Sequence, residues 1–333
     1  MAVIHDVMPA YELFQPTDVE AAIALLNEHG EGARVLAGGM DTWDWLKDRT
    51  KKVTALVDLA GIEELQEIRA TPDGVEIGAL APLTAVVKNA EIQQNYKVLA
   101  DAAVQVATPQ IRNQGTLGGN VSQDTRCWYY RAGWPCYRAG GNICYANTPA
   151  SLNREHAILG ADRCVAVSPS DTAPALIALD ARMVVRNRGG EREIEAANYF
   201  IGPGTDITRM TVLQQGDVLT AIRIPNTWSG ARFYFEKITD RKAWDFPLVN
   251  VASALRVENG TIQDARIAVG GVAPKPLRLF RVEQAIVGRA LNEETATEAG
   301  DLAVRGAEPL RLNGYKVPLM RNLVKRSIRG QEA

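Results

Sequence analysis

The sequence has neither a long hydrophobic run nor an excess of charge of one sign. No apolar stretch in the chain approaches the roughly 20 residues that a membrane-spanning helix requires, so membrane insertion is not expected. The formal net charge of −2 argues against nucleic acid or an anionic membrane as a partner. The N-terminus lacks the basic and apolar segments of a secretory signal, so a cytoplasmic protein is expected.

Histidine is scarce, and the motifs of hydrolytic enzymes are missing. His5, His29 and His156 are the three histidines, and they lie far apart in the chain. Neither a G-x-S-x-G elbow nor an H-E-x-x-H metal motif occurs, so hydrolytic chemistry is poorly supported. We expect His29 to cap a helix or lie at the surface. His156 is expected to be structural, with a hydrogen bond to a metal ligand as the alternative.

The periodicity of the chain indicates a globular protein that begins with a β-α-β unit. Thr17 and Glu20 form a capping box, which predicts a helix with Thr17 as its N-cap, and Gly30 ends that helix. Strand patterns occupy residues 10–15, 35–37, 54–60, 75–80 and 217–224, helix patterns occupy 42–47, 83–90 and 98–107, and residues 174–187 read as a helix followed by a strand.

A change of pattern after Pro225 marks a domain boundary within residues 226–230. Three strand-like segments follow, with Asn259-Gly260 as a hairpin turn, and they predict a three-stranded antiparallel sheet. Helical patterns then appear around residues 281–288, 293–306 and 317–329.

Two glycine-rich turns are candidate ligand-binding sites. Gly38-Gly39 follows a strand and precedes a helix, an arrangement that presents backbone N–H groups to an anion, although a plain turn explains it equally well. The second turn is TPQIRNQGTLGGN (residues 108–120), where glycines let the backbone approach a ligand and Arg112 offers a positive fork for phosphate. It is neither a P-loop nor G-x-G-x-x-G, so no Rossmann domain is inferred.

All four cysteines fall within 38 residues: Cys127, Cys136, Cys144 and Cys164. Thiols used as core filler would be scattered through the chain. The spacing C-x8-C-x7-C-x19-C lacks the close pairs that are typical of zinc sites, whereas a [4Fe–4S] cube takes one thiolate per iron and suits a long irregular loop. Spacing alone leaves an iron–sulfur cluster, zinc and unliganded thiols open.

Aromatic and basic residues accompany the cysteines. The aromatic residues would shield a cluster from water, and the arginines would offset its charge. The aromatic residues are Trp128, Tyr129, Tyr130, Trp134, Tyr137 and Tyr145, and the arginines are Arg126, Arg131, Arg138 and Arg163.

Four segments together resemble one known family. They are VLAGGMDT (residues 35–42), ATPQIRNQGTLGGN (107–120), SPSD followed by PALIALDA (168–181), and FEKITDRKAWDFPLVNVASAL (235–255). In this order they resemble the FAD-binding medium subunit of the xanthine-oxidase family of molybdenum hydroxylases, and the resemblance covers about residues 10 to 329. The thiol-bearing insertion resembles the [4Fe–4S] variety seen in periplasmic aldehyde oxidoreductase and 4-hydroxybenzoyl-CoA reductase.

The resemblance implies an α+β fold of the vanillyl-alcohol-oxidase (PCMH) type. An FAD-binding domain would occupy residues 1–225, with subdomains of about 1–60 and 61–225 and a [4Fe–4S] loop at 123–167. A C-terminal domain like that of the CO dehydrogenase flavoprotein would occupy residues 230–333, with a three-stranded antiparallel sheet and helices.

The resemblance also implies the cofactor contacts. The first glycine turn would bind the FAD pyrophosphate through backbone amides, the second would form the opposite wall, and Asp171 would hydrogen-bond the polar chain of the flavin. Met40 replaces the commoner Thr or His, so only a backbone contact is expected there. The implied FAD-binding residues are Val35, Leu36, Ala37, Gly38, Gly39, Met40, Asp41, Thr42, Ala107, Thr108, Arg112, Gly115, Thr116, Gly118, Gly119, Asn120, Asp171, Leu219 and Lys237, and the implied cluster ligands are the four cysteines.

The function that these expectations imply is electron transfer, with no catalytic residue on this chain. Electrons would pass between the [2Fe–2S] clusters of a small partner and an external acceptor such as ferredoxin, NAD or dioxygen, while a large partner holds molybdopterin. The alternatives are a stand-alone flavin oxidase of the same fold and a zinc-stabilised structural module. A partner's twin-arginine signal would instead place the complex in the periplasm.

Overall fold

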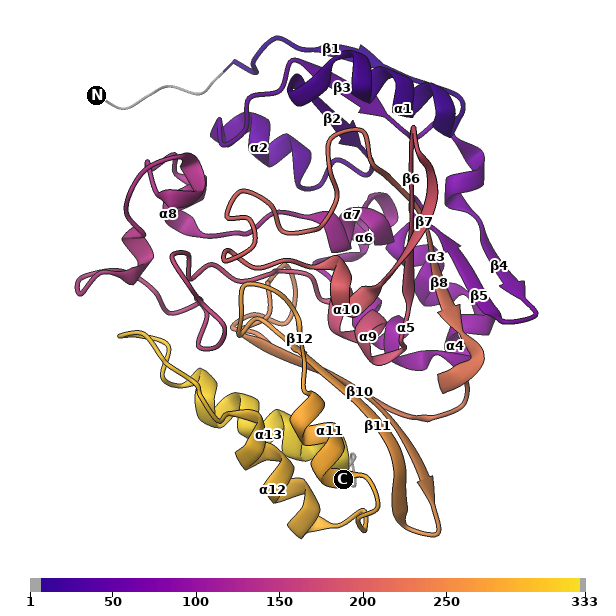
Figure 1. The fold of residues 1–333 in the computed structure, drawn as a ribbon, viewed down its shortest axis with the longest axis vertical. Helices are drawn as coiled ribbons and strands as arrows, with labels where there is room; N and C mark the ends of the chain where they lie inside the picture. The colour runs from indigo at the N-terminus through magenta and orange to yellow at the C-terminus, as the bar shows by residue number, and fades with distance from the viewer. Residues whose placement is uncertain (1–6, 330–333) are drawn as a thin grey trace.

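Three β-sheets form the framework of the molecule, which is a computed structural model describing residues 7–329 (Figure 1). The first is parallel, with strand order β1-β3-β2, and the second is antiparallel, with order β4-β5-β8-β6-β7. Their strands are β1 (Glu12–Phe14), β2 (Ala33–Leu36), β3 (Ala55–Asp58), β4 (Ile68–Thr71), β5 (Gly74–Gly78), β6 (Arg182–Asn187), β7 (Gly190–Glu195) and β8 (Val218–Pro225). His5 lies outside the described residues.

The third sheet is antiparallel and C-terminal, with order β12-β11-β10-β9. Its strands are β9 (Arg232–Ile238), β10 (Val249–Glu258), β11 (Thr261–Gly270) and β12 (Leu277–Arg278). The predicted α+β class with a C-terminal sheet is therefore confirmed. The predicted strand number was wrong, because the short β12 pairs with β11 as a fourth strand.

Thirteen α-helices connect or cover these sheets in the described part of the chain. They are α1 (Val19–Glu28), α2 (Thr42–Asp48), α3 (Leu83–Lys88), α4 (Ala90–Asn95), α5 (Lys97–Val104), α6 (Pro109–Gln114), α7 (Leu117–Ser122), α8 (Trp128–Arg131), α9 (Thr172–Ala178), α10 (Ala196–Tyr199), α11 (Phe280–Ile286), α12 (Glu293–Ala303) and α13 (Lys316–Arg329). The helix patterns read around 281–288, 293–306 and 317–329 correspond to α11, α12 and α13. Within residues 7–329, no helix is long and apolar enough to span a bilayer.

Helix α1 shows how local sequence sets an element boundary. Its cap is Asp18, whose Oδ1 accepts a hydrogen bond from the Ala21 amide at 2.7 Å, so the prediction of Thr17 as the cap was wrong by one residue. An aspartate at this position also places negative charge at the helix N-terminus. The buried side chains of Val19 and Ala22 pack with the parallel sheet in one core cluster, and His29 is the C-terminal cap residue.

The second glycine-rich turn is folded into two short helices, α6 and α7, which sequence patterns read as a loop. Thr108 caps α6, with Pro109 in its first turn, and Thr116 caps α7 by accepting from the Gly119 amide at 3.0 Å. Six-residue helices are marginal on their own. Their caps and their packing therefore stabilise both helices, and α7 forms although it contains two glycines.

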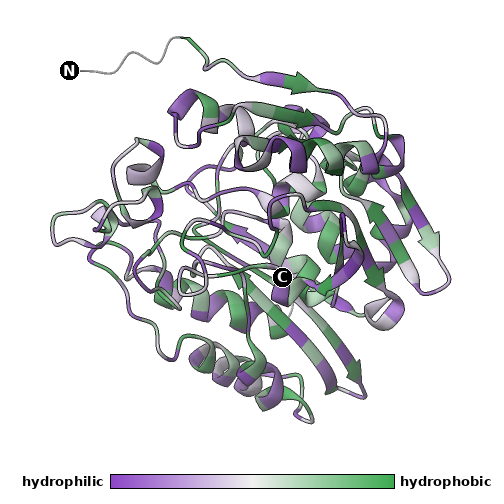
Figure 2. Ribbon diagram, turned by 45° about the horizontal axis from the view of Figure 1, so that its top comes forward, coloured by the Kyte–Doolittle hydropathy of each residue, from purple (hydrophilic) through white to green (hydrophobic). Residues whose placement is uncertain are grey.

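The C-terminal sheet buries both of its faces. Ala252 and Ala254 of β10 belong to the core that includes α5 and α9, whereas Val251 and Leu255 belong to the core that includes α12 and α13. This alternation is the two-residue period of a strand. In Figure 2 the strands are mostly green and the connecting loops are mostly purple or white. One hydrophobic core therefore continues across the boundary after Pro225.

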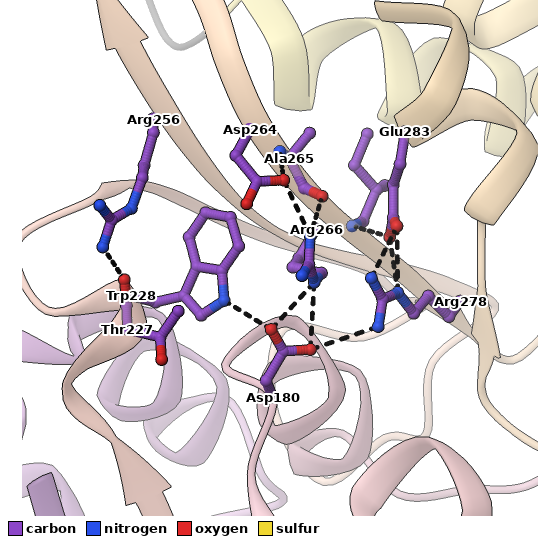
Figure 3. A network of polar contacts seen from close by, with 10 residues as sticks. Asp180, Thr227, Trp228, Arg256, Asp264, Ala265, Arg266, Arg278 and Glu283 are labelled. Atoms are coloured by element: carbon purple, nitrogen blue, oxygen red, sulfur yellow. Dashed lines mark hydrogen bonds and ion pairs between the residues drawn. The ribbon is translucent and has the colours of Figure 1, made fainter. Parts of the chain in front are cut away.

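A polar network also crosses this boundary (Figure 3). The Asp180 carboxylate accepts from Trp228 Nε1 at 2.7 Å, Arg266 Nε at 2.9 Å and Arg278 Nη1 at 3.2 Å. Arg278 also donates to Glu283 at the start of α11 at 2.9 Å. Asp180 pairs with Arg266, which lies over the Trp228 ring, so the network fixes the C-terminal sheet to the residues that follow α9.

Candidate functional site

A cavity of about 560 Å³ lies where the two N-terminal sheets meet. Pockets that hold cofactors commonly enclose about 300–1,000 Å³. The predicted FAD-binding residues that line it are Val35, Ala37, Gly38, Gly39, Met40, Asp41, Thr42, Ala107, Gly115, Thr116, Gly118, Gly119, Asn120, Asp171 and Leu219. The structure thus brings most of the predicted set to one cavity.

The two glycine turns touch each other in this cavity. A Cβ on Gly38 would lie 2.2 Å from the Gln114 carbonyl oxygen and 3.0 Å from Gly115 Cα, distances that real side chains do not adopt. Gly39 has φ +75°, a conformation that glycine adopts without strain. Contact between Gly38 and Gln114, 76 residues apart in sequence, therefore depends on the missing side chain of Gly38.

The first turn keeps its backbone amides free. Among described residues, the N–H groups of Gly38, Gly39 and Met40 find no hydrogen-bond acceptor, although these residues line the cavity. Successive unpaired amides in a turn form a concave donor set for an anion. This turn is chemically suited to a phosphate.

The second turn uses its amides internally. Leu117 N–H donates to the Ala81 carbonyl at 3.0 Å, Gly118 N–H to the Ala79 carbonyl at 2.8 Å, and Gly119 N–H to Thr116 Oγ1. A Cβ on Gly118 would lie 2.7 Å from the Ala79 oxygen. This segment is therefore a close-packed wall, with no comparable set of free donors.

Asn120 joins the second turn to the SPSD segment. Its Oδ1 accepts from Ser170 Oγ and Thr172 Oγ1, both at 2.7 Å. Asn120 and Asp171 both line the cavity, so these hydrogen bonds keep two predicted contact residues next to each other.

Asp171 lies in a buried ion pair beside the cavity. Its Oδ2 accepts from Lys237 Nζ at 2.6 Å, and its Oδ1 accepts from Asn250 Nδ2 at 3.1 Å. Burial raises the pKa of Asp171 to about 6, although Lys237 and Asn250 oppose that rise. Lys237 also donates to the Asp245 carbonyl at 2.8 Å, and it holds Asp171 without itself lining the cavity.

Three other predicted residues lie behind the cavity wall. Leu36 is buried in β2, and Thr108 caps α6. Arg112 Nη1 donates to the Val106 carbonyl at 2.7 Å, so its guanidinium is engaged away from the lining. The structure does not bring the expected phosphate fork to the site.

Several lining residues were missed by the sequence analysis. They come from residues 213–218 and from Trp244, Asp245 and Phe246. Trp244 is 64% exposed and its amide donates to the Ala107 carbonyl at 3.0 Å, which fixes this loop at the second turn. The sequence signal that could have indicated this loop was the pair of aromatic residues in Trp244-Asp245-Phe246.

The four thiols form no disulfide and lie near one another. Cys136 is buried, and Cys127, Cys144 and Cys164 are half-buried. Burial raises the pKa of the Cys127 thiol to about 12, and the neighbouring Cys164 and Cys144 add to the rise. Burial also raises the pKa of Cys164, with contributions from Cys144 and Cys136. Within residues 7–329, no three His, Cys, Asp or Glu side chains are arranged to hold a single metal ion.

His156 contacts one of these thiols. Its Nε2 lies 3.3 Å from Cys127 Sγ, and its side chain is buried. Burial lowers the pKa of His156 to about 4, with Lys316 adding to the effect, so the imidazole is neutral near pH 7. The structure therefore favours the alternative role, a hydrogen bond to a thiol.

Charged side chains attach the thiol segment to the first glycine turn. Asp41 Oδ1 accepts from Arg131 Nη2 at 2.7 Å and pairs with Arg126 at 3.1 Å. Asp124 pairs with Arg138 at 2.5 Å and Lys51 at 2.8 Å. Burial alone would raise the pKa of Asp124, but these cations lower it to about 2. The arginines expected to offset a cluster's charge mainly neutralise these two aspartates.

The aromatic residues shield the thiols only in part. Tyr129, Trp134 and Tyr145 pack together, with ring centroids 4.8 Å apart for Trp134 and Tyr145. Trp128 and Trp134 are, however, 67% and 45% exposed. The six aromatic residues therefore do not all shield the thiols from water as predicted.

The matches to known proteins agree with the cavity and the fold. Residues 9–227 match the "FAD binding domain in molybdopterin dehydrogenase", and residues 234–330 match the "CO dehydrogenase flavoprotein C-terminal domain". The chain is an oxidoreductase subunit that belongs to the FAD-binding medium subunits of the molybdopterin dehydrogenase (xanthine oxidase) family. The predicted family and enzyme class are confirmed.

Similar individual proteins cover nearly the whole chain. The aldehyde oxidoreductase FAD-binding subunit PaoB of Escherichia coli is 31% identical, over 92% of this chain and 93% of that one. The carbon monoxide dehydrogenase medium chain of Hydrogenophaga pseudoflava is 29% identical, over 96% of each. A solved carbon monoxide dehydrogenase from the same organism aligns with a TM-score of 0.78 and 28% identity, over 97% of both chains.

Proposed function

We propose that this chain carries FAD and a [4Fe–4S] cluster and transfers electrons within a heteromeric molybdenum hydroxylase. It would pass them between a [2Fe–2S] subunit and an external acceptor. The observation that carries this proposal is the contact of the two glycine turns at Gly38, which places three free amides on a cavity of cofactor size.

The FAD pyrophosphate would lie on the amides of Gly38, Gly39 and Met40. Because the second turn has no comparable free amides, it would form the opposite wall, with Thr116 and Asn120 as polar contacts. Asp171 would accept hydrogen bonds from the flavin's polar chain, held in place by Lys237. When bound, FAD exchanges one or two electrons and so couples one-electron centres to two-electron acceptors.

The cluster would be held by Cys127, Cys136, Cys144 and Cys164. A supporting observation is that the thiols lie close together: Cys164 and Cys144 add to the raised pKa of Cys127, and Cys144 and Cys136 add to the raised pKa of Cys164. A cubane does not require four thiols around one point, because each iron takes one thiolate.

The partners would be a large molybdopterin-binding subunit and a small [2Fe–2S] subunit, and the acceptor would be ferredoxin, NAD or dioxygen. The similarity to medium chains of multi-subunit enzymes supports this assignment. We place the complex in the cytoplasm, with a twin-arginine signal on a partner as the route to a periplasmic location.

The test is to purify the chain with the products of its neighbouring genes and to measure flavin, iron and zinc. The proposal predicts one FAD and about four iron atoms on this chain, beyond those of the [2Fe–2S] subunit. Bound zinc without flavin would support a structural module instead. Oxidation of an aldehyde or alcohol by the isolated chain would support a stand-alone flavin oxidase.

A further inference from the structure

The contact between His156 and Cys127 brings one ring nitrogen of the imidazole to a thiol sulfur. Nε2 lies 3.3 Å from the Cys127 sulfur, a normal length for an N–H···S hydrogen bond. Nδ1 is buried and has no hydrogen-bond partner among the described residues. The sulfur is the polar atom within reach of Nε2, so a proton on this nitrogen would make the imidazole the donor and a cysteine thiolate the acceptor.

The backbone around His156 is fixed from the C-terminal domain. Asn313 Nδ2 donates to the His156 carbonyl at 3.0 Å, and Lys316 Nζ donates to the Glu155 carbonyl at 2.9 Å. The Ala157 amide donates to the Val165 carbonyl at 2.9 Å. These bonds constrain the backbone on both sides of His156, whose imidazole contacts Cys127.

Cys127 occupies a particular position among the four thiols. A second cavity of about 70 Å³ is lined by Cys127 and His156, and it shares Arg126, Pro169, Asp245 and Phe246 with the large cavity. The other three cysteines line neither cavity. Cys127 is therefore the thiol that faces the FAD cavity, with four side chains forming the wall between them.

We propose that His156 Nε2–H would donate a hydrogen bond to the Cys127 sulfur and so raise the reduction potential of the cluster that this thiol would help to hold. The inference rests on the proposed [4Fe–4S] cluster. Reduction adds negative charge to the cluster, and a donor to a ligand sulfur stabilises that charge, so the reduced form is favoured. His156 acts through Cys127 and is a positioning residue.

The direct test is electron paramagnetic resonance of the reduced complex after labelling histidine with ¹⁵N. A hydrogen-bonded imidazole should give a ¹⁵N hyperfine coupling to the cluster, and that coupling should disappear in His156→Gln. Histidines in the partner chains remain in both samples, so the difference spectrum assigns the coupling. If both complexes contain the cluster and their spectra show the same ¹⁵N couplings, the inference is overturned.

The reduction potential provides a second readout. His156→Met keeps much of the volume but removes the donor, and it should lower the ratio of reduced to oxidised cluster about tenfold at fixed ambient potential. For a one-electron couple this equals a shift of about 59 mV. His156→Gln keeps an N–H and should fall between wild type and His156→Met, whereas the remote His29→Gln should match wild type.

The outcomes separate the two claims. An intact cluster whose potential is the same in wild type and His156→Met would contradict the role of His156 alone. A wild-type complex without iron on this chain would remove the proposed cluster itself, and the analysis of iron shows this before any variant is compared. If His156→Met fails to assemble the cluster, the ¹⁵N spectra of wild type and His156→Gln still test whether the imidazole is hydrogen-bonded to the cluster ligand.

Discussion

The glycine-lined cavity and the thiol segment of residues 123–167 share a wall but are built in opposite ways. The cavity is formed by turns next to strands and by capped helices. The thiol segment contains one α-helix, the four-residue α8, and is held by ion pairs to Lys51 and Asp41 and by residues of α13. The glycines that shape the first site can be recognised in the sequence, although their turns meet only in the folded chain, whereas the second site depends on charged side chains from distant parts of the chain.

The largest expected effect comes from removing the charge that holds the thiol segment. Asp124→Asn leaves the buried Arg138 and the adjacent Lys51 without their carboxylate, and an unpaired buried charge costs about 3–5 kcal/mol. Urea unfolding of the purified protein measures the loss. The matched control is Asp44→Asn, whose partner Arg126 forms a more exposed pair worth at most about 1 kcal/mol. Equal losses in the two variants would contradict the account.

A pH effect is expected from Lys316, which joins α13 to the thiol segment. Burial lowers its pKa from 10.5 to about 7, so between these values the unfolded chain binds a proton that the folded chain has released. The free energy of unfolding should therefore rise with pH across this window, by up to about 5 kcal/mol. Below pH 7 the penalty of burying the charged amine is fully present.

Lys316→Met isolates this contribution because it keeps the stem and removes the titrating group. From pH 7 to pH 10 the unfolding free energy of wild type should rise relative to that of Lys316→Met. A difference that stays constant over that range would show that Lys316 does not titrate as described.

Smaller losses of stability are expected in the glycine cavity, where Gly38→Ala and Gly119→Ala form a pair. The Gly38 methyl would meet the Gln114 backbone at 2.2 Å, so the turns must separate at a cost of about 1–3 kcal/mol, and FAD content should fall. The Gly119 methyl would meet only Thr116 Oγ1 within 4 Å, at 2.9 Å, so its effect on stability should be smaller. Thermal unfolding and the flavin absorbance measure both. A more stable Gly38→Ala variant would contradict the contact.

Much of the fold could be predicted because its elements bury a periodic apolar face. Helix α13 and strand β10 show this pattern, and both were identified within a few residues. Helix α7 was missed because its glycines disfavour a helix, and it depends on hydrogen bonds to the carbonyls of Ala79 and Ala81. Helix α6 was missed because its residues were read as part of the same loop. Strand β12 was missed because two residues are too few to show the alternating apolar pattern of a strand.

The site was predictable where backbone geometry demanded glycine. Gly38 and Gly115 do meet in the cavity, but the free amides of one turn and the engaged amides of the other depend on tertiary packing. The charge of Arg112 did not predict where its side chain lies, because the guanidinium donates to the nearby Val106 carbonyl instead of entering the cavity. The assignment of cofactor contacts and the domain limits remain predictions.

FAD and a cluster would occupy adjacent sites, each bound by residues of its own. The most direct measurement is the flavin and iron content of Cys136→Ser and Gly119→Val, each purified in complex with its partners. Cys136→Ser should retain one FAD and lose about four iron atoms, whereas Gly119→Val should lose FAD and retain that iron. If neither substitution changes the content of its own cofactor, the two-site account is wrong.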